Sequence, residues 1–180
     1  GLFTTLTNVS FNEQTLNELI EKVRTERERL VPQCFACASP CGTNNEYDLS
    51  HIWTDNEDIR SLKSLILFGI RGMAAYAYHA MVLGYTNDEV SHFFVKALFA
   101  LGEDWEMDKL LPIVMELGKV NLVCMEMLDK ANTETYGIPT PTTIDLKVEK
   151  GPFIVITGHD LYDLKQLLEQ TKDKEINVYT

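Results

Sequence analysis

The carboxyl-terminal segment constrains the fold more than any other part of the chain, because an apolar strand there leads into a helix and then into a second strand. Phe153–Ile156 is a short, β-branched run typical of a buried parallel strand. Leucines then recur at helical spacing from Leu161 to Leu168, and Ile176–Tyr179 follows as the second strand. Residues 151–180 therefore predict the opening β-α-β unit of an α/β domain.

Two parallel strands cannot bury both faces of their own sheet, so we expect more sheet to follow and the chain to be an internal fragment. An internal repeat supports truncation at the other end as well. The pattern Leu2-Phe3, Phe11 and Leu16 to Val23 recurs as Leu98-Phe99, Trp105 and Leu110 to Leu117. The second copy is preceded by two helices and the first by none, which predicts a first repeat truncated at its start. The alternative is a chance similarity between two amphipathic helices.

Helix starts are well marked between these ends. Three segments fit a capping box, in which a hydroxyl and a carboxylate satisfy amides of the first turn: Ser10–Glu13, Thr54–Glu57 and Thr86–Glu89. The sequence also predicts a helix from Trp105 to Leu117, with a kink or late start at Pro112, and a further helix after Gly118.

The predicted fold class is mainly α. Helices joined by turns as short as Gly84-Tyr85 favour an antiparallel helical bundle, and Gly69 and Gly72 would let a neighbouring helix come close. We expect a helical bundle domain over residues 1–150, in which 132–150 is a linker rich in Thr, Pro and charge, and a truncated β-α-β unit of a Rossmann-like α/β domain over 151–180.

The amino-acid composition limits which partners the chain could bind and in which cellular compartment it could lie. The 180-residue chain has a net charge of -11 at pH 7, which disfavours nucleic acid and anionic membrane surfaces as partners. Its most apolar segment, Leu65 to Leu83, is interrupted by Arg71 and His79, and we expect it to be too short and too polar to span a bilayer. The four cysteines do not form the framework of a secreted disulfide protein, which indicates a cytoplasmic location.

Cys34, Cys37 and Cys41 form the one metal-like constellation in the sequence. Their spacing would allow three thiolates to converge on an iron–sulfur cluster or on zinc. A fourth ligand is absent nearby, with His51 the closest candidate, and free loop thiols are the alternative interpretation. By contrast, Cys124 lies on the apolar face of its helix and is expected to be a core residue.

Several longer segments, spread over most of the chain, carry a family resemblance. They are Asn56–Leu62, Gly72–Ala77, Leu128–Gly137, Gly158–Leu161 and Leu167–Thr171. Their amino-acid sequences closely resemble those of the hybrid-cluster (prismane) proteins, which are iron–sulfur enzymes also called hydroxylamine reductases. The resemblance implies that a full-length parent reduces hydroxylamine or related nitrogen oxides at a hybrid iron–sulfur–oxygen cluster. The family's amino-terminal cysteine motif has no counterpart here, so the role of its ligands is not carried over to Cys34, Cys37 and Cys41.

The resemblance also implies what this chain contributes. The cluster ligands would come mainly from residues after Thr180, so we expect the fragment to bind no cluster by itself, to be inactive, and to serve as structural framework. His159 follows the first predicted strand, at the edge where open α/β sheets place ligands. The resemblance implies that His159 lines the entrance to the cluster without binding iron. A simpler alternative is that Gly158 makes a turn and Asp160 caps the helix.

The implied partners are the remainder of the parent chain and a small nitrogen-oxide substrate, and the open sheet favours a homodimer of the fragment. Two other functions remain open. The chain is either a stand-alone acidic helical interaction module that binds through Phe153, Val155 and Val178, or a segment of a protein related to carbon monoxide dehydrogenase, whose family shares helical and α/β domains. Extending the gene in both directions distinguishes the fragment from the module.

Overall fold

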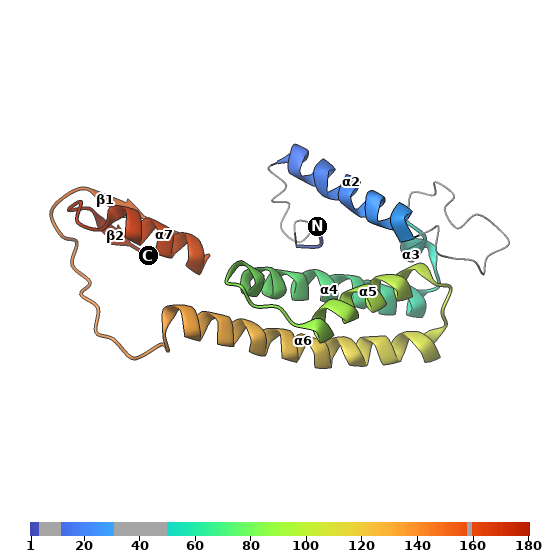
Figure 1. Cartoon of the computed structure of the whole chain (residues 1–180). Helices are drawn as coiled ribbons and strands as arrows, with labels where there is room; N and C mark the ends of the chain where they lie inside the picture. Colours follow the sequence, from blue (N-terminus) through green and yellow to red (C-terminus); the bar gives the residue numbers. More distant parts are fainter. Residues whose placement is uncertain (4–11, 31–49, 158–159) are drawn as a thin grey trace. The chain divides into compact units, whose positions relative to one another are not determined.

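The computed structural model describes residues 1–3, 12–30, 50–157 and 160–180, without the side chains of Leu30 and His51. Over these residues the chain has six helices and two strands (Figure 1). In order they are α2 (Glu13–Leu30), α3 (His51–Thr54), α4 (Glu57–Val82), α5 (Asp88–Gly102), α6 (Met107–Tyr136), β1 (Phe153–Val155), α7 (Leu161–Thr171) and β2 (Asn177–Tyr179). The prediction of a mainly α chain is confirmed. The chain divides into two compact units, Gly1–Pro139 and Thr140–Thr180.

The core of the first unit lies between α4, α5 and α6, which run beside one another in Figure 1 and contact each other pairwise. Each helix buries one face, because its apolar residues recur at helical spacing. The core includes Ile66, Ile70 and Met73 from α4, Val90, Phe93 and Leu101 from α5, and Leu110, Ile113, Leu117 and Val120 from α6. The short helix α3 adds Ile52 to the same core.

The predicted helix starts are correct, but asparagine supplies the cap in place of the predicted hydroxyl. Asn56 caps α4 by accepting a hydrogen bond from the amide of Ile59 at 3.0 Å, and Asn87 caps α5 through the amide of Val90 at 3.2 Å. The Thr54 and Thr86 caps are therefore wrong, and the predicted Ser10 cap lies outside the described residues. An asparagine amide oxygen satisfies the same amide of the first turn as well as a hydroxyl does, so a segment with both has two candidate caps.

The predicted late start at Pro112 and the predicted break at Gly118 are wrong. A single helix, α6, begins at Met107 and runs for 30 residues through both positions. Its buried residues keep helical spacing on either side of Gly118, with Leu117 before it and Val120 after it. Burial of that continuous face outweighs the roughly 1 kcal/mol that a glycine costs inside a helix. The helix also includes residues 132–136, the start of the segment predicted as a linker.

The two glycines of α4 behave differently. A Cβ atom at Gly69 would overlap the Leu117 side chain of α6, so this glycine permits the close approach that was predicted. A Cβ atom at Gly72 would meet nothing within 4 Å, so no described residue approaches closely there.

The expectation that the apolar segment of α4 is too short to span a membrane is also wrong. The helix has 26 residues and a mean hydropathy of 1.3 in its most apolar window, which is long and apolar enough by length and composition. That criterion is one of length and composition alone. Within the described residues, α4 supplies Ile66, Ile70 and Met73 to the core of the first unit.

The second unit pairs β1 and β2 in parallel, with α7 between them in the sequence. Ile154 lies opposite Val178 in the register. Asp160 caps α7 by accepting from the amide of Tyr162 at 2.9 Å, as predicted. Phe153 and Val155 are about three-fifths exposed, so one face of the strand pair is open to solvent within the described residues.

Candidate functional site

The residues that the sequence singled out as ligands lie outside the described part of the chain. Cys34, Cys37 and Cys41 fall in segment 31–49, and His159 falls in 158–159. Within the described residues, no three His, Cys, Asp or Glu side chains lie together in a way that could hold a metal ion. This part of the chain therefore has no donor set that fits an iron–sulfur cluster.

Cys124 is the one cysteine that the structure describes, and it is buried in the core of the first unit. Its Sγ donates to the backbone carbonyl of Met73 at 3.6 Å. Burial raises the pKa of the Cys124 thiol, because the thiolate would lose its hydration there. The neutral thiol packs as a small apolar residue, in agreement with the sequence-based expectation, and is a poor nucleophile.

A groove of about 440 Å³ lies in the first unit. The amino-terminal residues enter it: Leu2 packs against the core, and the Phe3 ring stacks on Tyr78 with centroids 5.2 Å apart. Met81 and Phe94 line the groove with apolar surface, and residues of the loop before α5 line it as well. The apolar side chains give the groove a capacity for apolar contact.

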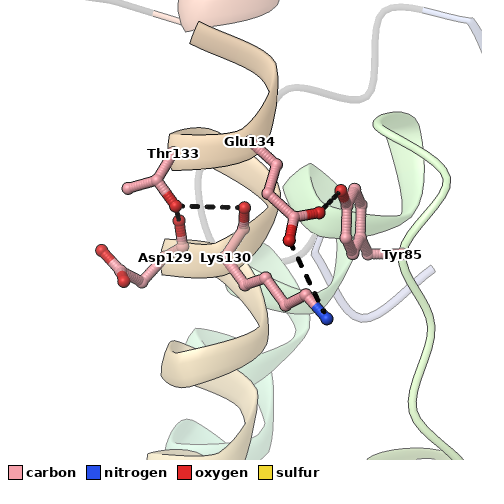
Figure 2. Close-up of polar contacts among 5 residues, drawn as sticks. All are labelled: Tyr85, Asp129, Lys130, Thr133 and Glu134. Carbon is pink, nitrogen blue, oxygen red and sulfur yellow. Dashed lines mark hydrogen bonds and ion pairs between the residues drawn. The ribbon is translucent and has the colours of Figure 1, made fainter. Parts of the chain in front are cut away.

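Tyr85, which also lines the groove, is hydrogen-bonded to the end of α6. Its hydroxyl donates to Glu134 Oε2, and the second carboxylate oxygen lies 4.0 Å from Lys130 Nζ (Figure 2). On the same helix, the Thr133 hydroxyl donates to the backbone carbonyls of Asp129 and Lys130 in the preceding turn (Figure 2). The hydrogen bond to Glu134, followed by desolvation and by the charge of Glu134, raises the pKa of the Tyr85 phenol.

This arrangement is a structural tether and has no evident catalytic chemistry. The phenol stays protonated at neutral pH, and the carboxylate that holds it is already paired with a lysine. The tether joins the turn between α4 and α5 to the last turns of α6. Sequence reasoning missed it because Tyr85 and Glu134 are separated by 49 residues, and no local pattern links two such positions.

A buried lysine is the second polar feature that sequence reasoning missed. Lys63 has no exposed side-chain surface, and its Nζ lies 3.5 Å from Asp55 Oδ2 at the start of α4. No hydrogen bond to the ammonium is present among the described residues. Removing an ammonium from water is costly, so Asp55 is needed to offset that cost.

The described residues thus make up a mainly helical protein whose polar contacts support its packing. The chain matches the Prismane/CO dehydrogenase family over residues 1–180. It is 41% identical to a hydroxylamine reductase of Methanocaldococcus jannaschii, with 100% of this chain and 36% of that protein covered. It is 42% identical to a hydroxylamine reductase of Chlorobaculum tepidum, with 99% and 35% covered, and 49% identical to one of Clostridium novyi, with 71% and 23% covered.

The chain belongs to the Prismane/CO dehydrogenase family. The resemblance to the hybrid-cluster, or prismane, proteins is thereby confirmed. The chain spans about a third of the length of the curated relatives it matches.

Proposed function

We propose that this chain is an internal part of a hydroxylamine reductase, and that it serves there as structural framework. The observation that carries the proposal is the coverage: the chain matches the M. jannaschii relative over its whole length but spans only 36% of that relative. The relatives named above are called hydroxylamine reductases, which favours this activity over that of a carbon monoxide dehydrogenase. The parent protein reduces hydroxylamine or related nitrogen oxides at a hybrid iron–sulfur–oxygen cluster.

The residues of the chain support a framework role. The long helices use their apolar faces for a shared core, and the polar contacts of Tyr85 and Lys63 hold neighbouring elements together. In this proposal α4, α5 and α6 form an antiparallel bundle, residues 132–150 link it to the next domain, and residues 151–180 open a Rossmann-like α/β domain. The remainder of the parent chain then supplies the cluster ligands and the rest of the sheet.

We assign roles to the cysteine segment and to His159 on the same basis. His159 follows β1 and lines the entrance to the cluster of the parent protein. Cys34, Cys37 and Cys41 are candidate metal ligands, and their thiols stay reduced in a cytoplasmic protein.

The proposal is tested by comparing the 180-residue chain with the full-length protein that contains it. Both are purified without oxygen, reconstituted with iron and sulfide, and assayed for hydroxylamine reduction. We expect the full-length protein to be brown and active, and the short chain to be colourless and inactive. Turnover by the short chain, or an inactive full-length protein with a complete cluster, contradicts the proposal. A brown but inactive short chain would identify Cys34, Cys37 and Cys41 as a cluster site, and Cys41→Ser should then remove the colour.

The open sheet favours a second candidate function, that of a module binding a partner's sheet or a second copy. Phe153 and Val155 are exposed on β1, and two short strands leave a sheet edge free for pairing. Sedimentation of the short chain and of the full-length protein over a range of concentrations distinguishes the two functions. A dimer that is lost on substitution of Val155→Lys in both proteins supports the module, whereas a dimer that forms only in the short chain supports the framework.

A further inference from the structure

Helix α6 carries apolar side chains on two separate faces. One face supplies Leu110, Leu117 and Cys124 to the core. The other face, here called the outward stripe, comprises Met107, Leu111, Met115, Gly118, Leu122 and Met125. Its five large side chains are between 45% and 67% exposed. A helix that is apolar on both faces is typical of the interior of a larger protein, and an exposed apolar stripe of this length marks an interaction surface.

The spacing of the outward stripe indicates what kind of element covers it. From Leu111 the positions advance by four, three, four and three residues to Met125. This alternation is the seam along which one α-helix packs against another. At 1.5 Å per residue, the seam from Leu111 to Met125 is about 21 Å long. A partner helix of about four turns would cover it.

Gly118 lies at the centre of this seam and has no role within the described residues. A Cβ atom there would meet nothing within 4 Å. A glycine inside a helix is unfavourable, so its presence at a seam position calls for a close neighbour. Such a close approach at a helix glycine occurs within this chain, where Gly69 of α4 makes room for the Leu117 side chain of α6.

We propose that the outward stripe packs against a helix of the full-length protein that lies outside these 180 residues, with a large apolar side chain of that helix seated over Gly118. This proposal rests on the proposed function. The occupant follows from the coverage: roughly two thirds of the length of the relatives lies beyond the matched region. A second copy of the chain, or α2 of the same chain, are the competing occupants.

Thiol labelling tests the proposal directly. Leu122→Cys is placed in both the 180-residue chain and the full-length protein, and the labelling rate at that site is read by peptide mass spectrometry. Lys109→Cys is the control, because Lys109 is exposed and lies roughly 140° around the helix from Leu122. We expect Leu122→Cys to react at least about tenfold more slowly in the full-length protein than in the short chain, with little change for the control.

The other outcomes each overturn the proposal. Equal rates at Leu122→Cys in the two proteins would mean that no part of the parent covers the stripe. Slow labelling in the short chain that is relieved on dilution would assign the stripe to a second copy. Slow labelling that persists on dilution would assign it to another segment of the same chain, such as α2. Failure of the proposed function is recognised separately, since the full-length protein would then lack hydroxylamine reduction whatever the labelling rates.

A second variant reports on Gly118 itself. In the short chain Gly118→Leu should raise the Tm, because it replaces an exposed helix glycine with a strong helix former. In the full-length protein the same variant should lower the Tm, since the added side chain would collide with the partner helix. A rise in both proteins would contradict the seating of a side chain over Gly118.

Discussion

At the scale of single residues, Gly69 sets how closely α4 approaches α6. Gly69→Ala is expected to lower the free energy of unfolding by about 1–3 kcal/mol, because the added methyl group overlaps Leu117 in a packed interface. Gly72→Ala is the matched control on the same helix and should raise it by up to about 1 kcal/mol, since its Cβ meets nothing. Urea unfolding of both variants checks the prediction. Equal stability of the two would show that the helices separate without cost.

The buried Lys63 gives a second prediction. Lys63→Met should leave stability unchanged or raise it by about 1–4 kcal/mol, because the apolar side chain needs no partner in the core. Asp55→Asn should instead destabilise by about 1–2 kcal/mol, since the buried ammonium loses its counter-charge; the partial exposure of Asp55 keeps the loss small. Urea unfolding of the two single variants and the double variant measures this. A loss on Lys63→Met larger than on Asp55→Asn would contradict it.

Tyr85 gives a pH-dependent prediction. Its pKa is raised from 10.0 in the folded chain, so folding favours the protonated phenol. The stability linked to this group is fully present below the pKa of the unfolded chain and is lost as the pH rises through the higher folded value. Difference titration of phenolate absorbance between the wild type and Tyr85→Phe isolates this group from the other tyrosines. Glu134→Ala should bring the pKa down, and an unchanged titration would contradict the tether.

At the scale of elements, the β-α-β segment is expected to be less protected than the helical core of the first unit. Its strands have three residues each, and α7 has no buried residue. Hydrogen exchange at Ile154 should therefore be much faster than at Ile66 and Ile70, which are fully buried in α4. Pairing of the strands with a second copy of the chain would slow exchange at Ile154, so the measurement is repeated at lower protein concentration. Slow exchange at Ile154 in a demonstrated monomer would show that the two strands form a stable sheet by themselves.

The helices also show how far local patterns reach. Capping signals placed the starts of α4 and α5 correctly, because the first turn exposes amides that only a few residue types satisfy. These signals did not identify which residue caps each helix, since Asn56 and Asn87 do so in place of Thr54 and Thr86. Gly118 and Pro112 suggested helix ends by propensity, and the continuous buried face of α6 overrode them.

At the scale of the whole molecule, the first unit should fold without the second. Every buried apolar residue among the described ones lies between Ile52 and Ala131. A chain ending at Pro139 is expected to unfold cooperatively in urea, with the same midpoint as the first unit of the complete chain. Fluorescence of Trp53 and Trp105 reports on this unit alone. A truncated chain without a cooperative transition would mean that the second unit stabilises the first.

The fold class was predictable from the sequence for physical reasons. Helical spacing of apolar residues and the strand, helix and strand order of 153–179 are local properties, and the structure has both. The metal-ligand predictions at Cys34, Cys37, Cys41 and His159 remain predictions, because those residues lie outside the described part of the chain. The family could be recognised from several segments of the sequence that resemble it, and the family match over residues 1–180 confirms that resemblance.

By itself, the sequence determined where α4 and α5 begin, the strand, helix and strand order of residues 153–179, that Asp160 caps α7 and that Cys124 is a core residue. Each of these depends on neighbours within a few positions. Only the tertiary structure decided which of two similar glycines matters, which lysine is buried and which tyrosine meets Glu134. Those outcomes depend on contacts between residues far apart in the chain, such as Gly69 with Leu117 and Tyr85 with Glu134. No local pattern carries that information, since the partner is chosen by how the helices pack.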